Sequence, residues 1–340
     1  MNKIYKVIWN HITECWIVVS ELCKSRTNIK CMALTSGLLS VAANASISTS
    51  SCVGDICYVD GTVNITSPWE DGNVQLSIGG NNEGVLTVEN SAIVRTYKLN
   101  IGENYNGELN VVDGGQYIVQ PDSTTDTYLL SIAHGKNTTG ILNVSGANSK
   151  FIHNNNGGEI NIGYGDGSRG IVNVNNGGQF LIRNNTNLYI GGRNGGYGEI
   201  NISGQDSNLS AYGSAILGTW GDASLTVIDG ASAEFTNGIL SIAYHANGYA
   251  TVSGEGSSLY ANKIKVGRKS AFGSLTINNG ASVTANQEFI IAEEGMANGH
   301  LIIGSARGEQ VQKAGTINSS SINFGAGTGL ITLNHSDDNY

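Results

Sequence analysis

The chain has 340 residues and a formal net charge of −9, with 47 glycines but only two prolines. Apolar residues recur regularly between the glycines, so the composition predicts many short strands joined by tight turns and excludes a disordered linker. The excess of acidic residues disfavours nucleic acid and anionic membranes as partners, and no stretch reaches the roughly 18 apolar residues of a membrane-spanning helix.

The N-terminal part has the features of a leader for export. Basic residues precede a short apolar stretch, and the motif "ANA" that ends at Ala45 matches the small-residue site at which secretory signals are cleaved. We therefore predict a signal peptide at 26–45, with cleavage between Ala45 and Ser46. Residues 1–25 form an extension in front of it.

Removal of the leader changes the charge and the cysteine content. Residues 1–45 hold five basic and two acidic residues, so the remaining chain carries 13 basic and 25 acidic ones, a net charge of −12. Only Cys52 and Cys57 remain, and in an oxidising compartment this pair either forms a small-loop disulfide or stays as two thiols. The segment 46–75, which carries the pair, is predicted to be an N-terminal cap or entry segment.

A repeat runs along residues 76–340. Each unit reads apolar-x-apolar-Gly, a loop rich in glycine and asparagine, Gly-x-apolar-x-Val, a turn, and a third short strand, as in "LNIGENYNGELNVVDGGQY". The second strands open at residues 84, 107, 140, 170, 198, 223, 248, 273 and 299. Nine units with a mean length of roughly 27 residues indicate a repeat fold.

The strands of the repeat alternate apolar and polar residues, as in Leu109-Asn110-Val111, so one face of each strand is buried. A single unit cannot bury its apolar face alone, but stacked units cover one another. We therefore predict an all-β fold, a right-handed parallel β-helix of the pectin-lyase-like type, with a repeated β-sandwich as the rival. The third strands add larger core residues, namely Tyr117, Phe151, Phe180, Phe235 and Leu259.

Turns recur once per coil in the same pattern. Asx-Gly pairs tolerate a positive φ and allow a sharp turn, so we interpret their Asp and Asn residues as turn formers rather than catalytic groups. Asparagine-rich stretches such as "HNNNGGE" are expected to form side-chain ladders between coils. The pairs are Asp113-Gly114, Asn176-Gly177, Asp229-Gly230 and Asn279-Gly280.

The leader and the repeats resemble a known family of secreted proteins. The start "NKIYKVIWN" and the core "WIVVSELCK" are similar to the extended signal peptide region of Gram-negative type V autotransporters. The repeats resemble the passenger domains of AIDA-type and antigen-43-type autotransporters, and the ending "AGTINSSSINFGAGTGLITLNHSDDNY" resembles their passenger-associated transport repeat. Trimeric autotransporters share the leader but have shorter head repeats, so the monomeric class fits better.

The resemblance implies export through the Sec translocon, outward transport by a C-terminal β-barrel translocator, and display on the outer membrane at the cell surface. The usual roles of the family are adhesion, self-association and biofilm formation. No barrel-sized segment follows Tyr340. We therefore expect an N-terminal portion of a longer protein or a truncated form, held in the periplasm unless a barrel acts in trans.

The repeats do not align residues for catalysis or metal binding. Acidic residues at one repeat position do not fall on neighbouring coils, as glycoside hydrolysis would require. The five histidines that follow the leader have no partners at metal-ligand spacing and are expected in solvent-exposed loops. We expect no metal, no cofactor and no enzymatic activity, with a polysaccharide-active β-helix enzyme or a remnant of a split gene as alternatives. These histidines are His134, His153, His245, His300 and His335.

The expected function is a non-enzymatic surface contact. A rigid rod would present its polar faces and loops to glycans or proteins of a host or bacterial surface, or to an identical rod, through many weak contacts. The longer loops at 121–127 and 164–169 are contact candidates. The aromatic candidates are Tyr105, Tyr164, Tyr197, Trp220 and Tyr244.

Overall fold

The computed structural model describes residues 5–10, 15–20, 52–70, 74–120, 128–155, 158–192 and 194–338. The chain divides into two compact units, Met1–Ala43 and Asn44–Tyr340. In the first unit, β1 (Tyr5–Asn10) pairs antiparallel with β2 (Cys15–Ser20). The predicted cleavage site at Ala45 and Ser46 and the predicted contact loop at 121–127 lie outside the described residues.

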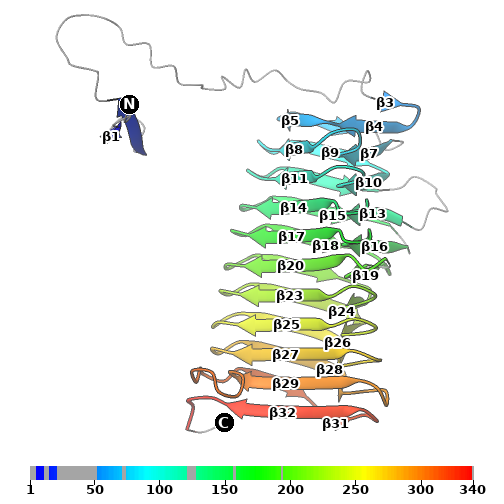
Figure 1. The fold of residues 1–340 in the computed structure, drawn as a ribbon, viewed down its shortest axis with the longest axis vertical. Helices are drawn as coiled ribbons and strands as arrows, with labels where there is room; N and C mark the ends of the chain where they lie inside the picture. The colour runs from blue at the N-terminus through cyan, green and yellow to red at the C-terminus, as the bar shows by residue number, and fades with distance from the viewer. Residues whose placement is uncertain are drawn as a thin grey trace, which may run out of the picture. The chain divides into compact units, whose positions relative to one another are not determined.

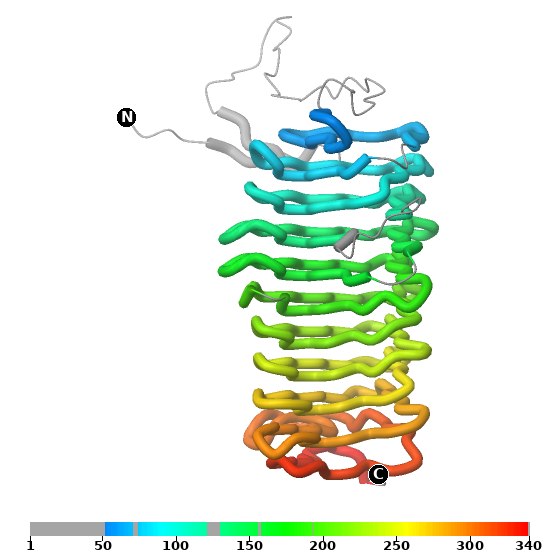
Figure 2. Tube along the Cα trace, turned by 90° about the vertical axis from the view of Figure 1, so that its right-hand side faces the viewer, coloured from blue at the N-terminus to red at the C-terminus, as the bar shows by residue number. Residues whose placement is uncertain are grey.

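The second unit is a parallel β-solenoid, in which the chain winds in stacked coils along one axis (Figures 1 and 2). Each coil contributes one strand to an eleven-stranded sheet. In order along the solenoid these are β5 (Gly61–Ile65), β8 (Gly84–Val88), β11 (Gly107–Val111), β14 (Thr139–Ser145), β17 (Arg169–Asn175), β20 (Tyr197–Ser203), β23 (Ala223–Ile228), β25 (Gly248–Ser253), β27 (Phe272–Asn278), β29 (Asn298–Gly304) and β32 (Thr328–Asn334).

A nineteen-stranded sheet forms the rest of the wall, and most coils contribute two strands or two halves of one long strand to it. In chain order it contains β3 (Cys52–Val53), β4 (Ile56–Val59), β6 (Trp69–Glu70), β7 (Gln75–Ile78), β9 (Ile93–Thr96), β10 (Lys98–Ile101), β12 (Gln116–Val119), β13 (Tyr128–Ile132), β15 (Lys150–His153), β16 (Glu159–Ile162), β18 (Gln179–Ile182), β19 (Asn187–Ile190), β21 (Asn208–Ala211), β22 (Ala215–Leu217), β24 (Ser232–Ile242), β26 (Ser258–Val266), β28 (Ser282–Ile291), β30 (Thr316–Ser319) and β31 (Ile322–Phe324).

The parallel β-helix prediction is confirmed, because equivalent residues of successive coils pair in register. Leu109 lies between Leu86 and Leu142 in parallel ladders, with all three side chains buried. The nine predicted second strands are β8, β11, β14, β17, β20, β23, β25, β27 and β29, and the structure adds β5 and β32 at the two ends. Within the segment 46–75, β4 and β5 pair in parallel with β7 and β8.

Large side chains stack along the inside of the solenoid. Tyr117 and Phe151 stack with their ring centroids 5.5 Å apart, and Phe151 meets Phe180 edge to face at 5.3 Å. All three rings are fully buried. The Tyr117 hydroxyl lies 3.0 Å from Thr96 Oγ1, and burial raises the pKa of the phenol. These residues belong to one inward column, which runs Val94, Tyr117, Phe151, Phe180, Leu209, Ala233, Leu259 and Val283.

Phe235 does not lie in this column, although the sequence grouped it with Phe180. It lies in the neighbouring inward column, where Ala211 and Ala261 are its partners in the coils on either side. Ala233 takes the position in line with Phe180 instead. A large and a small residue have therefore exchanged places within one coil, which keeps the total volume of the core layer.

The expectation that the histidines lie in exposed loops is wrong for His300, which is half-buried on β29, and most clearly for His153. It lies on β15 and its side chain is fully buried, in register with Val119 on one side and Ile182 on the other. Neither ring nitrogen has a hydrogen-bond partner among the described residues. Burial lowers the pKa of this imidazole to about 4, so the ring is neutral at physiological pH.

The N-terminal end of the described solenoid carries an antiparallel hairpin. β4 pairs in parallel with β7 on one edge and antiparallel with the short strand β3 on the other. Cys52 and Cys57 face each other across this hairpin and are joined by a disulfide. Because bare strand edges recruit other strands, β3 protects the edge of β4. The bond holds β3 in that position.

The predicted turns have the expected backbone conformation. Asp113, Asn176, Asp229 and Asn279 have φ values of 49°, 52°, 58° and 53°. Asn and Asp adopt such angles more readily than most residues. The interpretation of Asp113 and Asp229 as turn residues is therefore confirmed.

A ladder of asparagine side chains runs along the outer face of the eleven-stranded sheet. Asn143 donates to Asn110 at 2.8 Å, Asn173 to Asn143 at 2.9 Å, and Asn201 to Asn173 at 3.1 Å. These asparagines lie on the second strands of their units, each between two inward-facing apolar residues. The stretch "HNNNGGE", where the sequence predicted ladders, has one described amide contact of this kind, from Asn184 to Asn154 at 3.5 Å.

Replacing Asn173 with alanine removes two ladder hydrogen bonds. Because the side chain is half-buried, we expect the free energy of unfolding to fall by about 1 kcal/mol. Asn173→Thr should cost less, since Thr226 continues the same column two coils later. Urea denaturation followed by circular dichroism measures the difference. Equal losses for both variants would contradict this prediction, because threonine would then recover none of the stability that is lost with the ladder.

Candidate functional site

The loops between the two sheets form a continuous edge of the solenoid. We call them the edge loops; they are residues 79–83, 102–106, 133–138, 163–168, 218–222, 243–247, 267–271 and 292–297, together with the described residues between Ile190 and Tyr197. Each begins with a residue at positive φ, such as Gly218 at 70° or Ala243 at 63°. This explains why the sequence repeats Gly or Ala directly after each apolar-x-apolar strand.

Aromatic and charged side chains gather on the edge loops of neighbouring coils. Trp220 is 55 % exposed, and its ring stacks on His245 with centroids 4.1 Å apart. His245 meets Tyr244 edge to face at 4.6 Å. Arg268 and Lys269 from the next loop lie 5.0 and 5.1 Å from the centroid of the Tyr244 ring. Three consecutive loops thus form one cluster, which we call the lower loop cluster.

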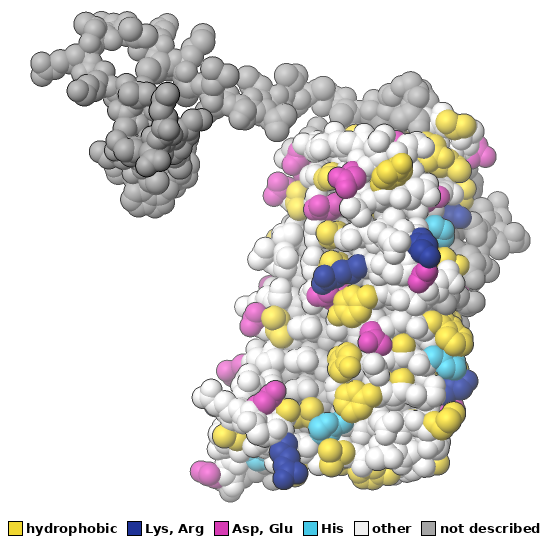
Figure 3. All heavy atoms as spheres, viewed as in Figure 1, with side chains coloured by type: hydrophobic (Ala, Val, Ile, Leu, Met, Phe, Trp, Pro, Cys, Tyr) yellow, Lys and Arg dark blue, Asp and Glu magenta, His cyan; other side chains and the backbone are white. Residues whose placement is uncertain are grey.

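Figure 3 shows hydrophobic, histidine and basic side chains one below another on the lower right-hand edge of the solenoid. The arrangement affects the protonation of the histidine. The pKa of His245 is lowered by loss of hydration and by the charge of Lys269, while Glu294 acts in the opposite direction. The ring of His245 is therefore neutral at physiological pH and packs against the indole of Trp220 as a flat surface.

A second group of rings lies farther toward the N-terminus of the same edge. His134 stacks parallel to Tyr164 with centroids 4.9 Å apart. Burial lowers the pKa of His134, Glu103 opposes this effect, and Lys98 adds to it. Tyr105, in the preceding loop, is 49 % exposed.

Tyr197 lies apart from these groups, at the start of β20. The guanidinium group of Arg169, from the preceding coil, lies 5.7 Å from the centroid of the Tyr197 ring. The Tyr197 hydroxyl lies 3.0 Å from Ser224 Oγ of the following coil. Arg169 also pairs with Glu199 at 2.7 Å. Tyr197 therefore links three coils on the outer face of the eleven-stranded sheet. Of the five predicted contact residues, Trp220 and Tyr244 come together in the lower loop cluster.

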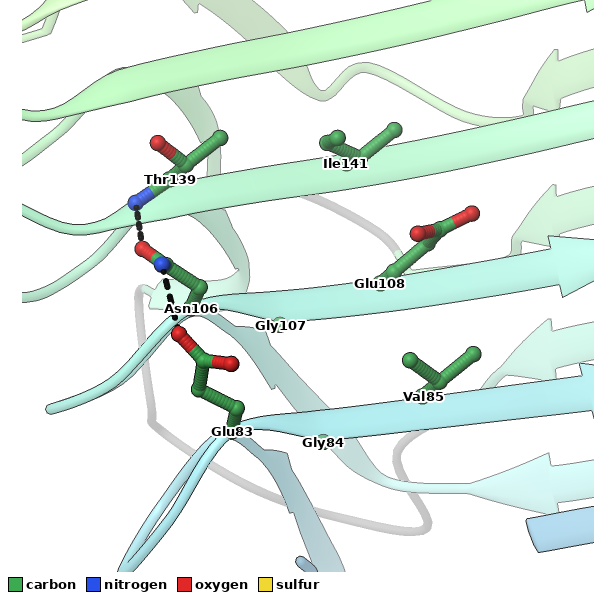
Figure 4. A pocket seen from close by; sticks show the side chains of 8 residues that line it. All are labelled: Glu83, Gly84, Val85, Asn106, Gly107, Glu108, Thr139 and Ile141. Atoms are coloured by element: carbon green, nitrogen blue, oxygen red, sulfur yellow. Dashed lines mark hydrogen bonds between the residues drawn. The ribbon is translucent and has the colours of Figure 1, made fainter. Parts of the chain in front are cut away.

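A shallow depression lies on the outer face of the eleven-stranded sheet, over β8, β11 and β14 (Figure 4). Asn106 donates to Glu83 at 3.1 Å and accepts from the backbone of Thr139 at 2.8 Å. Glu108 accepts from Asn143 at 3.0 Å. Both carboxylates are thus held by amides, Glu83 in an exposed position and Glu108 in a half-buried one.

Part of this arrangement was not predicted from the sequence. His245, Arg268 and Lys269 were not predicted as contact residues, and neither were the carboxylates of the depression. A sequence signal for these residues was available. Tyr244, Arg268 and Glu293 each directly follow the positive-φ residue of their loop, so they occupy equivalent positions of the repeat. Rings or charges at equivalent positions predict a column of side chains on the surface. In the described residues, no group of three or more His, Cys, Asp or Glu side chains is placed to hold a metal ion.

Comparisons with known proteins identify the leader. Residues 1–52 match the family described as Extended Signal Peptide of Type V secretion system. The chain is 29 % identical over 302 residues to the uncharacterized protein YuaQ of Escherichia coli strain K12, an alignment that covers 85 % of this chain and 21 % of that protein. The chain therefore spans about a fifth of the length of this relative. No solved structure matches the chain.

The predicted resemblance of the leader is confirmed by this match. The extended signal peptide directs the chain across the inner membrane of a Gram-negative bacterium in a type V secretion pathway, and it indicates that the solenoid is an autotransporter passenger. Within the described residues, no helix has the length and hydrophobicity needed to cross a membrane.

Proposed function

We propose that the solenoid is a non-enzymatic contact rod, which mediates adhesion, self-association or biofilm formation at the surface of the bacterium. The observation that supports this function most directly is the order of the parts. An extended signal peptide of type V secretion precedes a solenoid whose edge loops present Trp220, Tyr105 and charged side chains to the solvent. The cell surface as the final location, and a β-barrel translocator that brings the rod there, belong to this proposal.

The physical form of the solenoid supports a contact role. Its coils repeat the same outer positions at regular spacing, so a repeated ligand or a second rod can meet many equivalent contacts at once. Such contacts are individually weak but strong in sum, because each one raises the effective concentration of the next. The partners would be glycans or proteins on host or bacterial cells, or an identical rod.

Beads that carry the exported chain provide a test. The chain is produced in a Gram-negative host with its own signal region, purified from the periplasm and coupled to latex beads. We expect the beads to clump together or to adhere to bacterial or epithelial cells. A combined Tyr105→Ala and Trp220→Ala variant should reduce the bound fraction by about half or more, because exposed aromatic residues dominate many contact surfaces.

Beads coated with albumin serve as the control for non-specific sticking. The variant must also retain the circular dichroism spectrum and the thermal transition of the parent chain. If beads with the exported chain clump and adhere no more than albumin beads, the contact function is wrong for this chain.

A further inference from the structure

Basic residues are concentrated in one part of an otherwise acidic solenoid. The chain after Ala45 carries 13 basic and 25 acidic residues. Four of the 13 basic residues lie within the seven residues 263–269. This stretch covers the second half of β26 and the start of the following edge loop. The four are Lys263, Lys265, Arg268 and Lys269.

Three of these four cations have a carboxylate partner. Lys263 pairs with Glu288 at 3.3 Å, and both Lys265 and Arg268 pair with Glu293, the latter at 3.4 Å. Two carboxylates thus offset two of these three positive charges within the protein.

Lys269 differs from the other three. No carboxylate of the described residues lies within salt-bridge distance of its Nζ atom, which instead lies 5.1 Å from the centroid of the Tyr244 ring. A contact with an aromatic face attracts the ammonium only weakly at an exposed site. The ammonium group therefore keeps most of its capacity to donate hydrogen bonds to an external anion.

A flat apolar surface lies close to this cation. Trp220 is more than half exposed, and its ring is supported by His245, which in turn contacts Tyr244. Tyr244 is the residue over which Lys269 lies. The exposed indole and the ammonium group lie on loops two coils apart and are thus connected through two rings of the loop between them.

We propose that the lower loop cluster binds an acidic polysaccharide. The apolar C–H face of one sugar ring packs on Trp220, and the carboxylate of that sugar or the next one accepts hydrogen bonds from Lys269. Aromatic side chains that combine an apolar face with a polar edge suit a ligand that is itself apolar on one face and polar at its rim. The inference rests on the proposed contact function and names the chemical class of one partner.

The charge of the rest of the rod favours a polysaccharide over a nucleic acid. A nucleic acid carries a phosphate at every nucleotide and would meet the acidic surface on both sides of this cluster. An acidic polysaccharide with one carboxylate per disaccharide places its charges farther apart. It can engage Lys269 while its uncharged sugars lie over the neighbouring loops.

The test measures binding of the exported chain to fluorescently labelled hyaluronan and gellan oligosaccharides by anisotropy. Hyaluronan represents an animal source and gellan a bacterial one, and the tighter of the two identifies the source. We expect Lys269→Gln to weaken binding about threefold to fivefold and Trp220→Ala to weaken it about tenfold. Lys136→Gln is the matched control, because Lys136 lies on the same edge but pairs with Asp166 at 2.8 Å. This variant should bind like the parent chain.

Further readouts separate the possible outcomes. Quenching of tryptophan fluorescence reports on the site directly, since only Trp69 and Trp220 remain after residues 1–45 are lost. Equal binding of uncharged dextran, tighter binding of oligothymidylate, or equal losses for Lys136→Gln and Lys269→Gln would overturn the inference. So would clumping or cell adherence of the beads without any binding of acidic oligosaccharides, a result that leaves the contact function intact.

Discussion

Replacing Phe151 with alanine is expected to lower the free energy of unfolding of the exported chain by about 3–5 kcal/mol. The ring is fully buried and touches an aromatic ring in each neighbouring coil, stacked on Tyr117 and edge to face with Phe180. Alanine would leave a cavity that the hydrogen-bonded coils on both sides cannot close, because their spacing is fixed by the backbone ladders. Guanidinium denaturation monitored by circular dichroism measures the loss.

Phe151→Leu provides the matched control. The same inward column carries Leu209 two coils later and Leu259 farther on, so leucine fits this position in a neighbouring context. We expect a loss of less than about 1.5 kcal/mol for this change. If alanine and leucine destabilise the chain equally, the aromatic column is not what fills the interior at this coil.

Replacing His153 with isoleucine is expected to protect the solenoid against acid. The pKa of His153 is lowered to about 4 in the folded chain, whereas an unfolded histidine has a pKa near 6.5. Between these values only the unfolded chain binds the proton, so folding stability falls as the pH decreases from 6.5 to 4. The loss amounts to about 3 kcal/mol at most. Above pH 6.5 neither state is protonated, and His153 adds no pH dependence.

The experiment compares unfolding of the parent chain and His153→Ile between pH 7.5 and pH 4. Isoleucine occupies the same column one coil later, as Ile182, so it fits the position and removes two unpaired buried nitrogens. His300→Gln is the comparison: burial also lowers the pKa of His300, but this ring is only half-buried and lies 2.8 Å from Thr332 Oγ1, so its replacement should change the pH dependence less. The gain of His153→Ile over the parent should grow as the pH falls. A gain that is the same at every pH would contradict the proposed titration.

Most of the fold was accessible from the sequence, because each coil repeats the same local rules. The apolar-x-apolar strands, the positive-φ turns and the spacing of the second strands sufficed to predict parallel stacking. The exchange of Ala233 and Phe235 could not be predicted from the sequence. Either order of the two residues fits the alternation of inward and outward positions, and only the pairing register shows which column receives the ring. His153 was misplaced because a polar residue at an inward position violates the rule by which inward positions are recognised.

The candidate site was predicted only in part. Trp220 and Tyr244 were found from their residue type, but their connection through His245 was not. Trp220 and His245 are each the third residue of a five-residue loop on consecutive coils, a correspondence that residue type alone does not reveal. The role of Lys269 depends on which of the four neighbouring cations has no carboxylate partner. The sequence does not show this, because it does not show that Glu288 and Glu293 pair with the other three cations.

The uniform length of several coils has a consequence for inheritance. The second strands of four successive units open at residues 198, 223, 248 and 273, which are 25 residues apart. They pair residue for residue, with Gly198 over Ala223, Gly248 and Gly273. Unequal recombination between two such repeats would delete or duplicate one complete coil. No inward residue would move to the outer face, because the period of the strands is preserved. The reach of the rod can thus lengthen or shorten between generations in steps of one coil, without a new fold.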